Sequence, residues 1–447
     1  MIPELEKKLD SFDSEIRRDS LDKLLSRVKS GEILPEKNKH FVNLHSHTFF
    51  SFNGYGYSPT SVAWRSFKMG LEAVGIVDFD VLDGTAEILE AGEKLGIRTV
   101  AGIETRVYVK EWAEKVINSP KEPGICYFIG IGFYRKPDAG SNAGKTLLSM
   151  KAIAKQRIID MIERINSYLE DVRIDYARDV LSLTPMENAT ERHVLDAYYY
   201  KAMGRFSSSK NELISFWSDK LGVETNKIAV IIEDRPKVCE IIRSKLMKHG
   251  GPGYVYPDKN SFPLLEDVIN MIDKTDALPA AAWLDGTSEG ESDAGKYLKF
   301  FMDKGTVLVN IIPDRNWNIE NKDEKRKKIE KLDEIIKLSR KLNLPLIAGT
   351  EMNKFGQKFV DEFNTDELKP YLDDFRKGAF FVYGHTCLAR DCSKGYNSAW
   401  AKEHFPDRAE RNAFYIKAGS SIVPGSTVYS RIKNLKDKAD PLMIINK

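Results

Sequence analysis

Two histidines, His45 and His47, stand one residue apart near the end of the apolar segment 41–48. Side chains alternate between the two faces of a strand, so both imidazoles would point to the same side of a sheet. Two imidazoles on one face can bind a divalent metal ion. The alternative is a pair of neutral histidines that are hydrogen-bonded inside the core, and the motif by itself does not decide between the two.

Carboxylates interrupt or end other apolar segments. Asp78 and Asp80 end one segment, Glu104 lies within a second, and Glu351 ends a third. A buried carboxylate is costly unless it is paired or bound to a metal ion. For each acid alone, a salt bridge or a helix cap is the simpler explanation. Taken together, the two histidines, Glu104 and Glu351 form a nitrogen and oxygen ligand set that suits Zn²⁺, Mn²⁺ or Fe²⁺, and we predict a metal site.

The segments that must position these residues alternate with helical patterns. Predicted strands lie at 41–48, 73–80, 99–109, 125–133, 277–283, 307–312, 344–351 and 380–384, and the helices between them include 57–69, 85–95, 290–303 and 322–342. Seven or eight short strands separated by helices favour a (β/α) barrel. In such barrels functional residues gather at the carboxyl ends of the strands.

The pattern changes after the fourth predicted strand. Residues 144–250 are almost entirely helical in pattern, with a long helix at 145–169 and one weak strand candidate at 228–232. We predict five parts: a helical N-terminal extension at 1–39, the first part of the barrel at 40–139, a helical insertion over the active-site mouth at 140–255, the second part of the barrel at 256–390, and a C-terminal appendage at 391–447.

The composition describes a globular protein with a sizeable core, because 42% of the residues are hydrophobic and 30% are charged. The net charge is only +2, from 68 basic and 66 acidic residues, which argues against a strong nucleic-acid or membrane surface. The four cysteines lack Cys-x-x-Cys spacing. Charged residues occur within the first few positions of the chain, so no apolar signal core is seen there, and the apolar runs are too short to span a bilayer. We therefore expect a cytoplasmic protein, and the oligomeric state stays open.

These motifs, in this order, resemble the PHP family, which is named for polymerase and histidinol phosphatase. The matching segments are residues 45–48, 77–80, 101–104 and 348–353, and residues 191–194 in the predicted insertion look like a segment of a branch that hydrolyses nucleotide phosphates. The resemblance covers roughly residues 40–355. It implies a distorted (β/α)7 barrel of the PHP type, with a helical insertion and N- and C-terminal extensions, and metal-dependent hydrolysis of phosphoesters.

Family members with a full site bind three metal ions, and this chain departs from that pattern at two of the three sites. The positions of the first site are His45, His47, Glu104 and Glu351, so a ligand type is present at each. The positions that match ligands of the other two sites are Tyr127, Trp283, Phe52, Phe79 and Asn353. The resemblance therefore implies a degenerate, mononuclear metal centre beside a pocket lined by aromatic side chains.

Cationic side chains could partly replace the missing ions. Arg192 and His193 in the predicted insertion and Arg315 in a polar loop are our candidate catalytic residues, with His193 as general acid or phosphate ligand. The alternatives are a solvated helix histidine and a surface arginine. Asp78 is a candidate for orienting a ligand imidazole. His385 follows the predicted strand at 380–384, and its role is either packing or the replacement of a missing imidazole.

The leading hypothesis is a metal-dependent hydrolase that acts on a small phosphorylated substrate, such as a nucleotide or a sugar phosphate. A second hypothesis is a non-catalytic PHP-like binding or scaffold protein that retains a structural metal site. A third is hydrolysis of a C–N bond or a carboxylic ester, which a barrel with a single metal ion can also support. The loss of imidazole positions favours the second hypothesis, and the retained set of four ligands opposes it.

Overall fold

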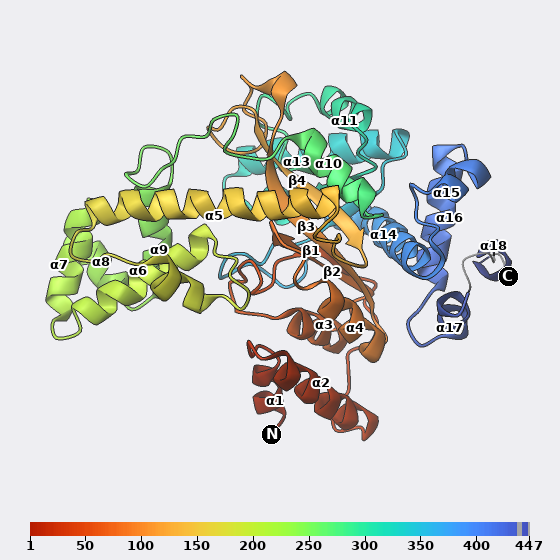
Figure 1. Cartoon of the computed structure of the whole chain (residues 1–447), viewed down its shortest axis with the longest axis horizontal. Coiled ribbons are helices and arrows are strands. Elements are labelled where there is room, and N and C mark those ends of the chain that lie inside the picture. Colours follow the sequence, from red (N-terminus) through yellow and green to blue (C-terminus); the bar gives the residue numbers. More distant parts are fainter. Residues whose placement is uncertain (436–439, 446–447) are drawn as a thin grey trace. The chain divides into compact units, whose positions relative to one another are not determined.

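The computed structural model describes residues 1–435 and 440–445, and the chain forms two compact units. Unit 1 comprises Met1–Phe49, Asn53–Leu148 and Pro263–Lys447, and unit 2 comprises Phe50–Phe52 and Ser149–Phe262. Unit 1 contains the sheet, and unit 2 is built from helices (Figure 1). The predicted placement of the helical insertion over the active-site mouth stays a prediction.

The described residues of unit 1 form a seven-stranded sheet with the strands in sequence order. The strands are β1 (Val42–Ser46), β2 (Ala73–Phe79), β3 (Arg98–Tyr108), β4 (Ile125–Phe133), β5 (Leu278–Trp283), β6 (Leu308–Ile311) and β7 (Leu346–Ala348). Neighbouring strands are parallel, except that β4 runs antiparallel to both β3 and β5. Ser46 and Glu351 form a parallel bridge that joins the two ends of the sheet, so the sheet is a nearly closed barrel. The predicted distorted (β/α)7 barrel is confirmed.

Helices cover the barrel strands, as the nearly continuous burial of those strands requires. The helices of this layer are α3 (Pro59–Lys68), α4 (Thr85–Leu95), α10 (Leu265–Lys274), α11 (Ala294–Asp303), α12 (Asp314–Trp317), α13 (Lys322–Lys341) and α14 (Leu372–Cys392). Local signals set some of their ends. The side chain of Ser58 accepts a hydrogen bond from Ser61 N at the start of α3, and Gly96 ends α4 in the left-handed conformation.

Two predicted strands are wrong. Residues 380–384 lie inside α14, and residues 228–231 lie in α8 (Thr225–Ile231). The run Phe380-Phe-Val-Tyr-Gly reads as a strand because it is continuously apolar, but α14 is buried on every side along this stretch, and a helix buried all round shows no amphipathic period. A short apolar run therefore cannot distinguish a buried strand from a buried helix.

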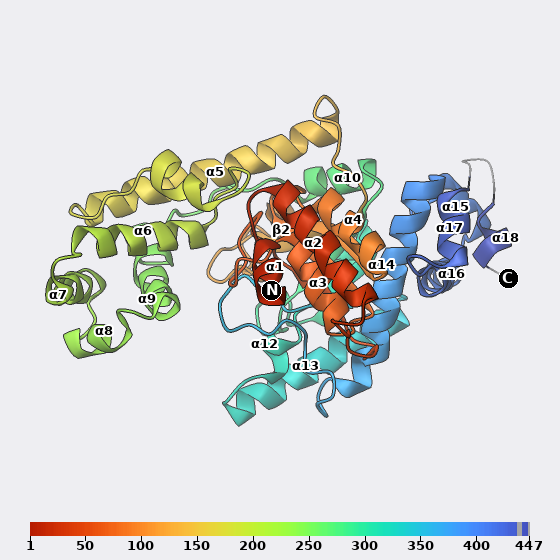
Figure 2. The same cartoon turned by 90° about the horizontal axis from the view of Figure 1, so that it is seen from below.

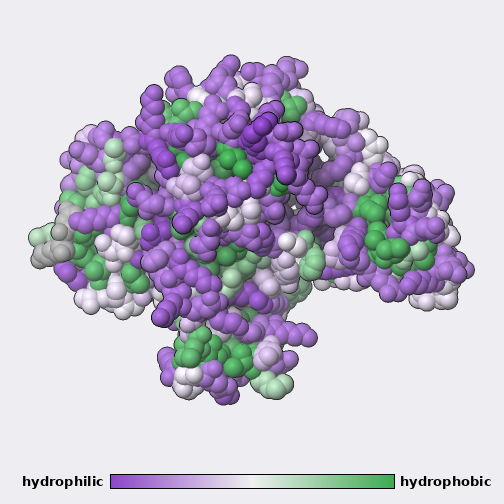
Figure 3. Space-filling model, turned by 180° about the vertical axis from the view of Figure 1, so that it is seen from behind, coloured by the Kyte–Doolittle hydropathy of each residue, from purple (hydrophilic) through white to green (hydrophobic). Residues whose placement is uncertain are grey.

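Both ends of the chain are helical. The predicted N-terminal extension consists of α1 (Ile2–Lys8) and α2 (Ser14–Lys29), separated at Asp13, whose side chain caps α2. The C-terminal part contains α15 (Ala399–His404), α16 (Arg408–Ser421), α17 (Thr427–Lys433) and α18 (Leu442–Ile445), and α16 lies beside α14 (Figure 2). Residues 436–439 and 446–447 of the predicted appendage lie outside the described residues. The N-terminal helices carry exposed apolar side chains, visible as the green area at the bottom of Figure 3.

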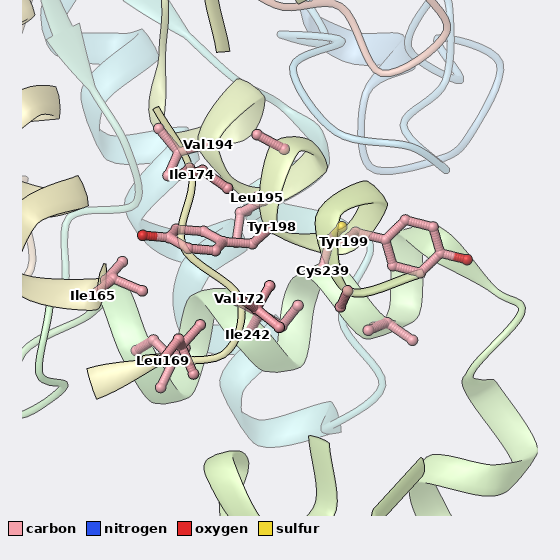
Figure 4. Close-up of a cluster of buried hydrophobic side chains, with 14 of the residues drawn as sticks. Ile165, Leu169, Val172, Ile174, Val194, Leu195, Tyr198, Tyr199, Cys239 and Ile242 are labelled. Carbon is pink, nitrogen blue, oxygen red and sulfur yellow. The ribbon is translucent and has the colours of Figure 1, made fainter. Parts of the chain in front are cut away.

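Unit 2 has a hydrophobic core of its own. Its helices are most of α5 (Asn142–Tyr168), then α6 (Glu191–Arg205), α7 (Lys210–Leu221), α8 and α9 (Arg235–Ile242). Ile165 and Leu169 from α5 and Val194, Leu195 and Tyr198 from α6 belong to this core (Figure 4). Across residues 1–435 and 440–445, each helix is either too short or too polar to pass through a lipid bilayer.

Candidate metal centre

His45, His47 and Glu104 meet where β1 ends, beside the part of β3 that pairs with the end of β2. The Nε2 atom of His45 lies 3.4 Å from Glu104 Oε2, and the Nε2 atom of His47 lies 3.0 Å from the same oxygen. One ligand atom from each residue lies within 4.8 Å of the others, and the three residues are buried. The sheet register brings these three residues together. β2 lies between β1 and β3, and both strands run parallel to it.

The donor set fits a divalent metal ion. Within the described part of the chain, His45 Nε2 and Glu104 Oε2 are buried and make no hydrogen bond of good geometry. Buried polar atoms in proteins are nearly always paired, so two such atoms that converge on one point indicate a site for a ligand. Two imidazole nitrogens and one carboxylate oxygen are a combination that Zn²⁺, Mn²⁺ and Fe²⁺ accept.

The charges in the cluster favour an ionised Glu104. Burial alone would raise the pKa of Glu104, but the two imidazoles more than offset this and lower it from 4.5 to about 2. Burial likewise opposes a charge on His45, yet the neighbouring Glu104 carboxylate raises the pKa of that imidazole above 6.5. Glu104 is therefore ionised at neutral pH, as a metal ligand must be.

Asn310 orients His45, and the sequence analysis missed this residue. Its Oδ1 lies 3.1 Å from His45 Nδ1, and its side chain is buried on β6. Because an amide oxygen only accepts, His45 carries a proton on Nδ1, and its Nε2 faces Glu104. Metal-binding histidines typically have such a second partner. The available signal was a lone polar residue inside an otherwise apolar strand.

Two residues of β2 hold His47 and the backbone that follows it. Asp78 accepts hydrogen bonds from the backbone N and from Oγ1 of Thr48, both at 2.7 Å, so it fixes the chain directly after His47. The ring of Phe79 stacks on the imidazole of His47 with centroids 4.2 Å apart. Asp78 was expected to orient a ligand imidazole; the hydrogen bonds to Thr48 show that it positions the neighbouring backbone.

The backbone of Glu351 is hydrogen-bonded to two residues of the cluster, whereas its carboxylate binds two other side chains. Its N donates to His45 O at 2.9 Å, and its O accepts from His47 N at 2.7 Å. Its carboxylate accepts from Arg315 Nη2 at 2.8 Å and from Gln357 Nε2 at 3.0 Å. The φ angle of Glu351 is +61°, a conformation that costs energy and is common at functional sites. Its role as fourth ligand stays a prediction.

Arg315 is a half-exposed cation beside the cluster. It lies on α12, directly after β6, and 46% of its side chain is exposed. The Glu351 carboxylate, with smaller contributions from Tyr127 and Glu104, raises the pKa of Arg315 above its ordinary value. Its guanidinium is therefore held in place by an ion pair and still reaches solvent.

His193 and Arg192 belong to unit 2, at the start of α6. His193 is buried, its Nδ1 accepts from Thr190 N at 3.1 Å, and its ring meets the edge of Phe52 with centroids 5.1 Å apart. Burial lowers the pKa of His193 to about 3, so the ring is neutral and carries its proton on Nε2. Arg192 forms an ion pair with Glu240.

The remaining positions singled out in the sequence have structural surroundings. Trp283 is fully buried at the end of β5, and Tyr127 is partly exposed near the start of β4. His385 is not at a strand end: it is buried in α14, its Nδ1 accepts from Tyr396 N at 2.9 Å, and burial lowers its pKa to about 4. These contacts give His385 a packing role between α14 and the segment that follows it.

No family model matches the chain. An error-prone DNA polymerase from Nocardia farcinica is 34% identical over 64 residues, which are 14% of this chain and 6% of the polymerase. An error-prone DNA polymerase from Cutibacterium acnes is 31% identical over 71 residues, which are 16% of this chain and 6% of that protein. The chain thus spans only about one seventeenth of the length of these curated relatives.

Solved structures with a similar course of the chain include two bacterial proteins. An amidohydrolase from Chromobacterium violaceum, with bound sulfate and no metal, has a TM-score of 0.46 and 15% identity, over 74% of this chain and 95% of that one. A candidate metal-dependent phosphoesterase from Bifidobacterium adolescentis has a TM-score of 0.46 and 16% identity, over 76% of this chain and 98% of that one.

Proposed function

We propose that this chain is a metal-dependent hydrolase of the PHP phosphoesterase type, which acts on a small phosphorylated substrate through one divalent metal ion. The observation that carries the proposal is the buried cluster of His45, His47 and Glu104, with ligand atoms within 4.8 Å of one another. In this proposal Glu351 is the fourth ligand. The resemblance of the surrounding motifs to PHP phosphoesterases supports phosphoesters as the bond class.

A divalent ion held by these residues would lower the pKa of a water molecule and polarise a phosphoryl oxygen. The protein supplies the geometry, because Asn310 orients His45 and Phe79 stacks on His47. Arg315 offers a planar set of N–H donors that suits phosphate oxygens. A divalent ion would add two positive charges beside the Arg315 guanidinium and favour an anionic substrate.

Arg192 and His193 complete the proposed set of catalytic residues. A neutral His193 with its proton on Nε2 can donate a hydrogen bond to a phosphate oxygen, as a phosphate ligand does, but with a pKa of about 3 it has no imidazolium at neutral pH to serve as a general acid. Arg192 is the proposed second cation for phosphate oxygens. Its ion pair with Glu240 holds the guanidinium at the start of α6.

The first experiment is elemental analysis of protein purified without added metal, for the wild type, His47→Ala and the exposed control His404→Ala. We expect about one transition-metal ion per chain in the wild type and in His404→Ala, and none in His47→Ala, because the substitution removes a ligand. A screen of phosphomonoesters then tests turnover. Two or three ions per chain would contradict the mononuclear centre.

Substitution of Asn310 tests the orientation of His45. We expect Asn310→Leu to lower the affinity for zinc about tenfold to a hundredfold, because the imidazole loses the partner that fixes its tautomer. Asn310→Asp keeps an acceptor oxygen at the same place and should retain zinc. Competition with a chromophoric chelator measures both affinities, and an unchanged affinity in Asn310→Leu would show that His45 is oriented by other contacts.

The second candidate function is a non-catalytic binding protein. The observation that favours it is the contact of Glu104 with both imidazoles, because a charged pair of His45 and Glu104 could occupy this site with no ion. Protein that takes up no zinc, manganese or iron on reconstitution would support this candidate over the hydrolase.

A further inference from the structure

Tyr127 lies on the same face of the sheet as Glu104. The register of β3 and β4 pairs Arg106 with Tyr127 and Glu104 with Ile129. Directly opposite residues of an antiparallel pair share a face, so Tyr127 and Glu104 are diagonal neighbours. Because β4 runs against its neighbours, its first residues lie at the edge of the barrel where β2 and β3 approach the metal cluster.

Tyr127 differs from the rest of its strand in exposure. The other residues of β4 are buried, whereas Tyr127 is partly exposed. Its position is fixed through the backbone, since its N donates to Asn118 Oδ1 at 2.8 Å and Asn118 Nδ2 donates to Ala282 O at 2.5 Å on β5. The backbone of Tyr127 is therefore held on a rigid support.

Arg315 approaches the same cluster from the side of Glu351. The backbone of Glu351 is bonded to both His45 and His47. One N–H of Arg315 binds Glu351, and a guanidinium has five N–H donors in all. Tyr127 and Arg315 thus border the metal cluster from two sides, Tyr127 as a neighbour of Glu104 and Arg315 as the partner of Glu351.

We propose that Tyr127 is a further catalytic residue, whose hydroxyl and the Arg315 guanidinium together bind the non-bridging oxygens of the substrate's phosphoryl group. This inference rests on the proposed phosphoester hydrolase. The hydroxyl adds a directional donor without adding charge, and the arginine supplies the charge. Tyr127→Phe removes only the donor and keeps the ring, so the pair can be tested with little disturbance of the barrel.

The test is calorimetric titration of zinc-loaded protein with inorganic phosphate. We expect Tyr127→Phe to raise the Kd for phosphate about tenfold, the effect of losing one hydrogen bond to a charged group. Zinc content should stay at the wild-type level. The matched control is Tyr134→Phe, directly after β4, whose hydroxyl binds Asp276 at 3.2 Å; its Kd should equal that of the wild type.

The double variant Tyr127→Phe with Arg315→Lys tests whether both residues bind one anion. We expect its Kd to rise by less than the product of the two single effects, because each single change already weakens the hold on the same phosphate. Multiplicative effects would mean that the residues act independently and would overturn the pairing.

The outcomes separate this inference from the proposed function. Full zinc content with an unchanged Kd in Tyr127→Phe would overturn the inference and leave the hydrolase proposal standing. Wild-type protein that takes up zinc but binds no phosphate would likewise overturn the inference about Tyr127 and Arg315. If the wild type takes up no zinc, the proposed metal-dependent function fails. The phosphate titration of zinc-free protein still tests Tyr127 and Arg315, because an equal Kd for phosphate in the wild type and in Tyr127→Phe overturns the inference.

Discussion

Glu104→Gln should lower the affinity for zinc more than about a hundredfold, which corresponds to roughly 2.7 kcal/mol. The carboxylate touches both imidazoles and is the one acidic member of the buried cluster among the described residues. An amide of the same shape removes the charge while keeping the packing. Competition titration measures the loss, and Glu289→Gln, an exposed acid outside the site, is the control.

The same variant has a second readout that needs no metal. The pKa of Glu104 is about 2 in the folded chain against an ordinary value of 4.5, so its ionised form stabilises the fold above pH 4.5. That contribution is lost as the pH falls from 4.5 toward 2. We therefore expect the wild type without metal to lose more stability than Glu104→Gln over this pH range. Equal losses of stability in the wild type and Glu104→Gln, together with an unchanged zinc affinity, would contradict the role of Glu104 as an ionised metal ligand.

The elements that could be predicted from the sequence are those with local signals. The helix at 85–95 agrees with α4 because Gly96 ends it, and the strand at 125–133 agrees with β4 because its apolar run is bounded by turn residues. The run at 380–384 was assigned wrongly because burial on every side of α14 erases the period that identifies a helix. Which neighbours cover a segment is a property of the tertiary structure.

The candidate site shows the same division between local and distant information. The spacing of His45 and His47 is a local signal, and the acid Glu104 stands out in its apolar strand. Asn310, in contrast, contacts His45 across 265 positions of sequence, and Gln357 acquires its role only by reaching the Glu351 carboxylate. Neither residue belongs to a motif, so only the folded arrangement identifies them.

The charge of Arg315 could be noted in the sequence, but its partner could not. A polar loop makes a surface arginine the simple expectation, and the side chain is indeed half exposed. The ion pair with Glu351 depends on β6 and β7 lying side by side, which places α12 next to the segment after β7. The same pairing explains why a predicted metal ligand and a predicted catalytic cation share one hydrogen bond.

Gly378→Ala should destabilise unit 1 by about 3 kcal/mol, because overpacking against a backbone atom cannot be relieved by turning a side chain. Gly378 lies on α14, where an added Cβ would overlap the carbonyl oxygen of Leu346 in β7. The loss would appear as an unfolding midpoint lowered by about 5 °C. Calorimetry measures it, and Gly204→Ala is the control: that glycine, in α6, has open space around it, so alanine should be neutral or slightly stabilising.

This substitution also connects the fold to the site. β7 leads directly to Glu351, whose backbone is bonded to His45 and His47, so a displacement of β7 reaches two residues of the metal cluster. We expect Gly378→Ala to lower zinc affinity as well as stability, while Gly204→Ala changes neither by much. A Gly378→Ala protein as stable as the wild type would contradict the close seating of α14 on β7. Lower stability with full zinc affinity would instead show that the cluster is held by β1 and β3 alone.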